Sequence, residues 1–326
     1  MSDPAVLRHV IASITPASAA HGEAARRRVA GAGAPLLERL ATALGGAQHT
    51  PRPRSARRAI VVCAGDHGVG DPGIALGAAH PTAVAAHAIA DGSAALAQLA
   101  RASRAPIVLI DAGTREPGEL PPCAVRLGRG PSRDLMAGPA MTIVDAALAL
   151  EAGIALAVSL ADDGEPGGID LLAVGALGVG ADVASAALLG AAIGAPPTGL
   201  ADPLAEAAGA RGAELAGASP LELLAAFGGP ETGVLAGLML AAASTNLPVI
   251  IDSYATGAAA LIAAALAPHA TGYLVAAHTG SFTHARILAH LGLHPVFDLG
   301  LGHGEGTGAA MALALIDHMA AVASRG

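Results

Sequence analysis

Short runs of consecutive apolar residues alternate along the chain with longer alanine-rich stretches, and this alternation restricts the possible folds most. The runs are rich in Val, Ile and Leu without polar residues at every second position, which is typical of strands buried on both faces. Helices between such strands indicate a parallel sheet with right-handed crossovers. We predict strands at residues 59–64, 107–110, 154–160, 171–174, 249–251 and 273–276.

The composition supports an α/β protein with a Rossmann-like, mostly parallel sheet flanked by helices. The chain has 326 residues, of which 53% are hydrophobic and 13% charged, and this apolar content excludes a disordered chain. We predict a small helical domain at residues 1–50, joined by the C-terminal helix at 309–326. The large α/β domain is predicted at residues 55–308, after an arginine- and proline-rich linker.

Several classes of protein are excluded by the charged and aromatic residues. All 18 basic residues are Arg, because the chain contains no Lys, which excludes Schiff-base chemistry and a P-loop lysine. A net charge of −8 and an aromatic content of 2% argue against nucleic acid and anionic membranes as partners. Two cysteines, Cys63 and Cys123, are too few for a disulfide framework, and Cys63 is expected in the core.

The N-terminal sequence has neither a basic start nor an apolar signal core. The apolar stretch at 143–161 is interrupted by Asp145 and Glu151, so it does not indicate a membrane span. The sequence therefore predicts a soluble, cytoplasmic protein.

Polar residues follow nearly every predicted strand. Asp66 and His67 come after the first strand, Asp252 after the fifth, and His278 with Thr279 after the sixth. Ligands bind beyond the carboxyl ends of the strands in open parallel sheets, so these residues are candidates for substrate binding. The alternative is that they serve only as turn and cap residues.

The most specific segment is 302–308, where Gly and polar residues alternate before the last helix. Glycines allow a backbone to approach a ligand closely, and Thr307 is suited to capping the helix. Glu305 is interpreted either as a general base in a glycine-lined pocket or as a charge that complements the helix dipole. Both interpretations stay open on this segment alone.

A second glycine-rich segment, 175–180, precedes a helix and resembles a phosphate cradle. Its glycines, Gly175, Gly178 and Gly180, are predicted to bind phosphate, although Asp182 would repel an incoming anion. The histidines at 278, 284, 290 and 294 lack a zinc-binding spacing. We expect surface or helix-end histidines and no metal.

Four separated motifs together carry a family resemblance. They are Ala64-Gly-Asp-His-Gly-Val69, Phe227-Gly-Gly229 with Glu231, Asp252 with His278, Thr279 and His284, and Gly304-Glu-Gly-Thr-Gly-Ala309. Their order and spacing resemble the nicotinate-nucleotide:dimethylbenzimidazole phosphoribosyltransferase family, from about residue 59 to the C-terminus.

The resemblance implies a homodimer without a metal or organic cofactor, acting on small-molecule substrates. The implied reaction displaces nicotinate from nicotinate mononucleotide: a ring nitrogen of a benzimidazole-type base attacks the anomeric carbon with inversion, giving an α-linked nucleotide. Glu305 matches the family's base. The predicted substrate-binding residues are Asp66, His67, His80, His87, Asp252, His278, Thr279, Gly304, Gly306 and Thr307, and Thr198 and Gly199 are added to the phosphate-binding group.

Departures from the family pattern lie around the donor phosphate. Ala176 stands where the family has a glutamate, and Ala181, Asp182 and Val183 stand where it has Asn-Thr-Thr. Two alternatives therefore accompany the transferase prediction: a non-catalytic, base-binding paralogue or subunit, and a transferase whose donor lacks the 5′-phosphate.

Overall fold

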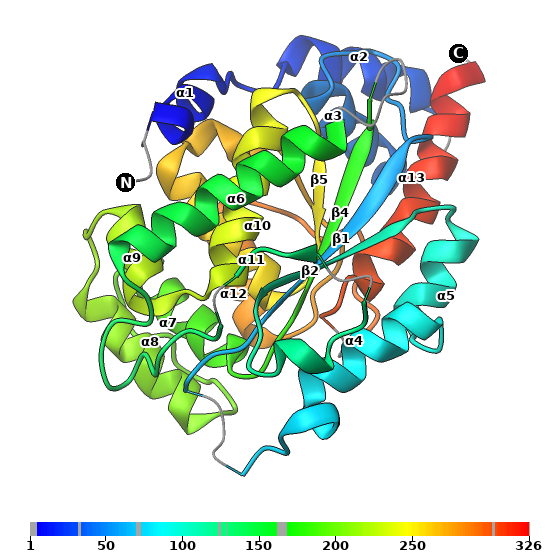
Figure 1. Cartoon of the computed structure of the whole chain (residues 1–326). Helices are drawn as coiled ribbons and strands as arrows, with labels where there is room; N and C mark the ends of the chain where they lie inside the picture. Colours follow the sequence, from blue (N-terminus) through cyan, green and yellow to red (C-terminus); the bar gives the residue numbers. More distant parts are fainter. Residues whose placement is uncertain are drawn as a thin grey trace.

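The computed structural model describes residues 5–31, 34–69, 73–122, 125–128, 130–161, 168–301 and 304–325. Its strands form one parallel sheet in the order β3-β2-β1-β4-β5-β6 (Figure 1). This order reverses between β1 and β4, as in a Rossmann sheet, and confirms the predicted α/β fold. The strands are β1 (Arg58–Gly65), β2 (Ile107–Gly113), β3 (Val125–Arg126), β4 (Leu171–Leu177), β5 (Val249–Ile251) and β6 (Leu274–Ala276).

Helices surround the sheet. The α-helices are α1 (Ala5–Ser13), α2 (Ala19–Val29), α3 (Pro35–Ala47), α4 (Pro81–Asp91), α5 (Ala95–Ala102), α6 (Ile143–Ala161), α7 (Ala181–Ile193), α8 (Pro203–Glu214), α9 (Pro220–Phe227), α10 (Pro230–Ser244), α11 (Tyr254–Leu266), α12 (Phe282–Leu291) and α13 (Thr307–Arg325). Short 3-10 turns lie at Gly77–Ala79, Pro117–Glu119 and Pro268–Tyr273.

Alternate residues of each strand enter two separate cores, as the two-residue period of a strand requires. Val61 and Cys63 of β1 pack with α6, α7, α10 and α11 on one face. Ile60 and Val62 pack with α3, α5 and α13 on the other. Figure 1 shows these two helix layers on opposite sides of the sheet. Cys63 is fully buried, as expected; Cys123 lies outside the described residues.

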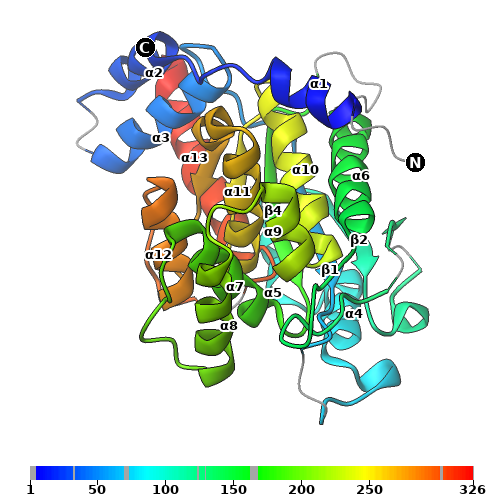
Figure 2. The ribbon, with the colours of Figure 1, turned by 90° about the vertical axis from the view of Figure 1, so that its left-hand side faces the viewer.

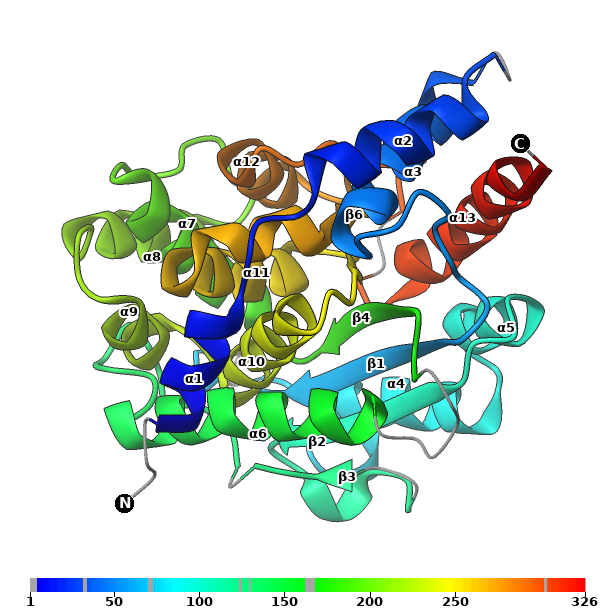
Figure 3. The ribbon, with the colours of Figure 1, turned by 90° about the horizontal axis from the view of Figure 1, so that it is seen from above.

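The C-terminal helix packs beside the N-terminal ones. Helix α13 contacts α2 and α3, and all three lie at the same end of the molecule (Figures 2 and 3). An ion pair between the buried side chain of Arg58 and Asp317, at 2.8 Å between Nη2 and Oδ1, attaches α13 to β1. Helix α1 lies apart from them against α6 and α10. The proposed division into a small and a large domain stays a prediction.

Within the described part of the chain, two helices, α6 and α13, are long and apolar enough to cross a membrane by length and composition. The same property is found in helices that cover a core. Helix α6 packs along α10, and α13 packs on α3 and α5, so both have a place in the helix layers of the sheet.

One strand prediction is wrong: residues 154–160 form the second half of α6. The buried residues of α6 are Ala146, Ala149, Leu150, Gly153, Ile154 and Ala157. Their spacing of three and four residues is helical. A short, continuous apolar run does not distinguish a strand from a buried helix, and here the whole stretch from residue 143 contains alanine and leucine, which favour helix.

The other predicted strands are present, with small differences. Strand β4 continues to Leu177, three residues beyond the predicted end, so that Gly175 lies inside the strand. Tyr273 belongs to the preceding 3-10 turn, and β3 was not predicted. With only two residues, β3 has too short a sequence pattern to be recognised.

Candidate active site

A cavity of about 240 Å³ lies at the carboxyl edge of the sheet, beside the reversal point between β1 and β4. Glu305 lines it and is half-buried. The loop after β4, the start of α4, the start of α11 and the segment before α13 complete it. The lining residues are Pro81, Thr82, Ala85, Ala176, Leu177, Gly178, Val179, Ala181, Ser253, Tyr254, Ala255, Gly304 and Glu305.

Helices α4, α7, α11 and α13 begin at this cavity. Helix N-termini present unpaired N–H groups and the positive end of the helix dipole. Gly180 precedes α7 and supplies no capping side chain. Among the described residues that line the cavity, none has a cationic side chain. An anionic ligand here would therefore be held by backbone N–H groups rather than by Arg.

The backbone of Glu305 is held from two directions. Ser253 Oγ donates to the carbonyl oxygen of Gly304 at 3.2 Å, and Ala176 N–H donates to the same oxygen at 3.2 Å. Gly175 lies directly against Glu305: a Cβ on Gly175 would be 2.2 Å from the Glu305 carbonyl oxygen. The predicted phosphate residue Gly175 therefore makes room for the segment that carries Glu305.

Asp252 and Gly306 meet beneath the same segment. Asp252 is fully buried, and its carboxylate accepts hydrogen bonds from the N–H groups of Gly306 and Ala309. Thr307 is the first residue of α13 and is buried; it lies inside the helix rather than before it as a cap. Gly302 and His303 lie outside the described residues.

Asp66, at the end of β1, connects the start of α4 with the loops that follow β2 and β4. Its carboxylate accepts hydrogen bonds from Thr82 Oγ1 at 2.6 Å, Arg115 N–H at 2.8 Å and Val179 N–H at 3.0 Å. Asp66 is fully buried. Thr82 and Val179 line the cavity, so Asp66 supports the cavity wall from behind and does not itself line it.

His67 belongs to a buried polar cluster with Glu231 and Ser132. Its Nε2 lies 3.1 Å from Glu231 Oε1, and its Nδ1 lies 3.3 Å from Ser132 Oγ. Burial works to lower the pKa of His67, but the Glu231 carboxylate opposes burial, and the pKa is raised above its ordinary value. The cluster ties β1 to the start of α10 as a buried ion pair.

His80 and His87 differ in burial, and neither lines the cavity. His80 is buried, and its Nδ1 accepts from Thr82 N–H, which caps α4. His87 is exposed, and its Nε2 lies 2.8 Å from the carbonyl oxygen of Glu119. Contact of these two side chains with a substrate therefore stays a prediction.

The predicted phosphate residues are not gathered in one place. Gly178 lines the cavity, and Gly180 lies two residues further along the chain. Their φ angles are 155° and 80°. Thr198 and Gly199 are exposed in the loop before α8, where Gly199 lies near the ring of Phe282. Thr279 is half-buried after β6 and does not line the cavity.

The expectation of surface or helix-end histidines is wrong for His278, which is buried and follows β6; His284 lies in the first turn of α12, at a helix end, and is also buried. Their rings meet edge to face, with centroids 6.0 Å apart. Burial, together with the neighbouring His278, lowers the pKa of His284 to about 3. His278 stacks on Phe297, with ring centroids 6.1 Å apart, and lies against Gly308, while His284 lies against Gly257 of α11. His290 and His294 are exposed.

Tyr254 is one of several lining residues that were not among the predicted site residues. It is the first residue of α11 and is the one aromatic side chain among the described residues that line the cavity. Burial, with a smaller effect of the Asp182 charge, raises its pKa. The sequence did point to this residue, because Tyr254 follows Asp252 and Ser253 at a strand end. Aromatic residues are rare in this chain, which has 2 Tyr, 3 Phe and no Trp.

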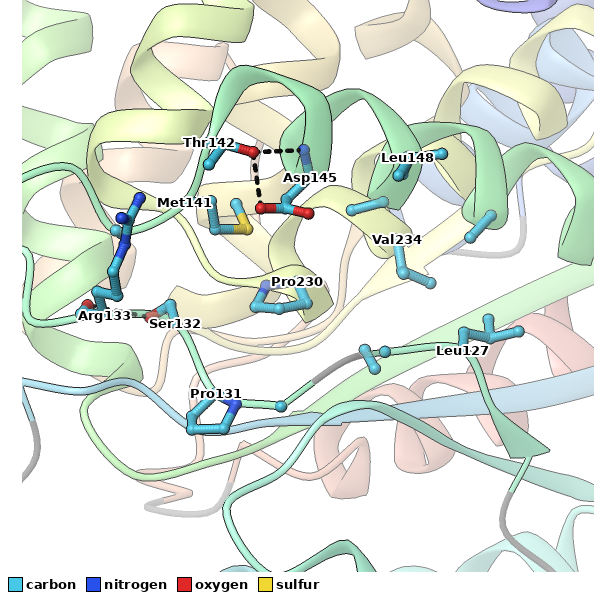
Figure 4. A pocket seen from close by; sticks show the side chains of 16 residues that line it. Leu127, Pro131, Ser132, Arg133, Met141, Thr142, Asp145, Leu148, Pro230 and Val234 are labelled. Atoms are coloured by element: carbon cyan, nitrogen blue, oxygen red, sulfur yellow. Dashed lines mark hydrogen bonds between the residues drawn. The ribbon is translucent and has the colours of Figure 1, made fainter. Parts of the chain in front are cut away.

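A second cavity, of about 380 Å³, lies on the α6 side of the sheet (Figure 4). Met141, Leu148 and Val234 form its apolar wall, and Ser132 and Arg133 lie at its other side. Thr142 and Asp145 bond to each other at the start of α6. None of the predicted site residues is among the described residues that line this cavity.

The fold and the cavity define an α/β protein with a candidate small-molecule site at the carboxyl edge of a Rossmann-like parallel sheet. A family model described as phosphoribosyltransferase matches residues 14–325, so the chain is a phosphoribosyltransferase. A nicotinate-nucleotide–dimethylbenzimidazole phosphoribosyltransferase of Desulforudis audaxviator is 36% identical over 97% of this chain and 94% of its own length. Another of Azotobacter vinelandii is 38% identical over 81% of this chain and 79% of its own. The chain therefore belongs to the nicotinate-nucleotide–dimethylbenzimidazole phosphoribosyltransferase family.

The crystal structure of a protein of that name from Thermus thermophilus is similar to this one, with a TM-score of 0.81 and 31% identity over 94% of this chain and 96% of that chain.

Proposed function

We propose that this enzyme transfers phosphoribose from nicotinate mononucleotide to a benzimidazole-type base such as 5,6-dimethylbenzimidazole. The observation that carries the proposal is a single carboxylate, Glu305, in a cavity where four helices begin and whose described lining residues include no cation. The names of the relatives agree with this pair of substrates. No metal or organic cofactor takes part in the proposed step.

In the proposed step, a nitrogen of the acceptor base attacks the anomeric carbon of the donor ribose. The bond from that carbon to the pyridinium nitrogen breaks, and its electron pair goes to the leaving nicotinate, whose ring becomes neutral. The acceptor loses its ring N–H proton to the carboxylate of Glu305, which acts as general base. Attack from the face opposite to nicotinate gives the α-linked nucleotide.

Tyr254 supports a flat acceptor. Its ring lines the cavity together with Glu305, and aromatic rings stack on planar heterocycles. The raised pKa keeps its phenol neutral. Tyr254 is therefore assigned to holding the base while Glu305 receives the proton.

A matched pair of variants tests the base. General bases contribute roughly 100- to 10,000-fold, so Glu305→Gln lowers kcat at least about 100-fold in an assay that follows nicotinate and the nucleotide product by chromatography and mass spectrometry. Glu214→Gln changes an exposed carboxylate at the end of α8 and leaves kcat unchanged. Full activity of Glu305→Gln contradicts the assignment.

The donor's phosphate is assigned to the N–H groups at the helix starts. Asp182, exposed in the first turn of α7, opposes an anion there, and this residue is the reason to consider a donor that lacks the 5′-phosphate. Comparing nicotinate mononucleotide with its nucleoside at equal concentration decides between them. A higher kcat/KM for the nucleoside selects the unphosphorylated donor.

We further propose a cytoplasmic homodimer. The outer face of α6 exposes apolar side chains, with exposed fractions of 46% at Ile143, 58% at Val144 and 57% at Val158, and such a patch favours a protein interface. Light scattering is expected to give twice the chain mass, and Val144→Asp is expected to give monomers. A monomeric wild-type protein contradicts this proposal.

A further inference from the structure

Asp252 is not placed to touch a substrate, although it belongs to the strand-end residues around the cavity. It follows β5, is fully buried, and is absent from the cavity wall. Its two carboxylate oxygens are directed instead to the chain around Glu305. We propose that Asp252 is the positioning residue of Glu305, an inference that rests on the proposed role of Glu305 as the base.

Two hydrogen bonds connect Asp252 to the segment. Oδ2 accepts from Gly306 N–H at 2.9 Å, and Oδ1 accepts from Ala309 N–H at 2.6 Å. Gly306 directly follows Glu305, and Ala309 lies in the first turn of α13. A carboxylate that bonds these N–H groups does the work of an N-cap, but here it comes from a different part of the sheet.

The charge of Asp252 is compensated where it lies. The N-terminus of α13 points at the carboxylate, and a helix N-terminus stabilises a negative charge. His278 Nε2 lies 3.6 Å from Oδ1, which brings a second group that carries positive charge when protonated. Because hydrogen bonds to a charged group are stronger than neutral ones, the pair of N–H bonds fixes the turn firmly.

The turn that follows Glu305 is closely packed. Gly308 lies against the ring of His278, where a Cβ would be 2.1 Å from Cδ2. Gly306 adopts a φ of 105°, which a residue with a side chain rarely adopts. Glu305 lines the cavity from this turn, and Asp252 holds the turn through the N–H groups of Gly306 and Ala309.

The central test replaces Asp252 by Asn, which has the same shape but turns one acceptor into an NH₂ donor. We expect kcat to fall about 10- to 100-fold, the loss corresponding to one charge-assisted hydrogen bond, with the KM of the donor changed less than about threefold. A kcat within about twofold of the wild type overturns the proposal.

A double variant separates positioning from a general loss of structure. If Asp252 acts through Glu305, Asp252→Asn lowers the residual kcat of Glu305→Gln no further. If Asp252 only stabilises the fold, both backgrounds lose the same factor, and that result overturns the proposal.

Asp170→Asn is the matched control. Asp170 is also a buried carboxylate that accepts a backbone N–H, from Arg57 at 3.0 Å, but it lies just before β4, at the opposite edge of the sheet. We expect Asp170→Asn to retain the wild-type kcat per folded molecule. A loss equal to that of Asp252→Asn shows that any buried carboxylate gives the effect and overturns the proposal.

Amide hydrogen exchange tests the same contacts without relying on activity or on a folded variant. In the wild-type protein, the Gly306 and Ala309 amides are expected to exchange slowly, like those of helix interiors. Rapid exchange of both overturns the proposal. A protein with protected amides but no transferase activity instead removes the proposed function and leaves the contacts of Asp252 established, so the two failures are distinguishable.

Discussion

Replacing Gly175 by Ala is the sharpest way to disturb the site without touching a reactive group. Gly175 lies in β4, and a Cβ there would be 2.2 Å from the carbonyl oxygen and 2.3 Å from the carbonyl carbon of Glu305. Real Cβ atoms do not come within 3.0 Å of such neighbours. One of the two backbones must therefore move by about 1 Å to restore normal contact.

The Glu305 segment is the part that moves. Strand β4 is paired with β1 along its whole length, where Gly175 is in register with Val62, and with β5 at Leu172 and Ala173. A displacement of about 1 Å at a catalytic group costs about 100-fold in rate, and forcing an extra methyl into a packed interior costs about 1–3 kcal/mol of stability. Gly175→Ala is therefore expected to lose about 100-fold in kcat, whereas a stability loss of about 1–3 kcal/mol leaves most of the protein folded.

The assay measures kcat on protein whose folded fraction is known from urea unfolding. Gly153→Ala is the control, because a Cβ on Gly153 would be 1.9 Å from the Val234 carbonyl oxygen in the contact of α6 with α10, away from the cavity. It is expected to lose stability but keep kcat. Activity of Gly175→Ala within about threefold of the wild type refutes the reasoning, as does an equal loss in Gly153→Ala.

Three further predictions concern pH and the acceptor. The pKa of His284 is lowered to about 3 in the folded protein. The stability that the protein has with this buried ring neutral is therefore fully present above pH 6.5 and is lost as the pH falls toward 3. Full protonation lowers the free energy of unfolding by an amount on the order of 5 kcal/mol. The free energy of unfolding of His284→Gln, measured with urea, should therefore fall less in acid. The pKa of His67 is raised, so its pH dependence is opposite to that of His284. Its pairing with Glu231 stabilises the fold below pH 6.5, and this stabilisation is lost as the pH rises through the pKa of the folded state. The difference in unfolding free energy between the wild type and His67→Gln should therefore become smaller at alkaline pH. Tyr254→Ala should raise the KM of the base about 2- to 12-fold, the value of one aromatic contact, whereas Tyr254→Phe should leave it unchanged.

The strands were readable because burial on both faces requires continuous apolar runs. This held for β1, β2, β4 and β5. It failed at residues 154–160, where the same kind of run covers a core as part of α6. Local sequence records that a segment is buried, and the length of the surrounding pattern decides between helix and strand.

For the candidate site residues, the sequence predicted the type of functional group better than the position of each side chain relative to the cavity. The motif around Glu305 indicated a carboxylate beside a cavity, and the structure has one there. Asp66, Asp252 and His67 were expected to meet a substrate, but each is fully buried. A strand-end polar residue has the same sequence signal whether it faces the cavity or the loop behind it.

The amino-acid sequence by itself indicated the parallel α/β class, strands β1, β2, β4, β5 and β6, the family and the candidate base, because these depend on local patterns and contiguous motifs. Only the tertiary structure decided that Gly175 touches Glu305, that Asp252 holds the start of α13, and that Tyr254 lines the same cavity. These contacts join segments that are far apart in the chain, and no local pattern records which side of a loop faces its neighbour.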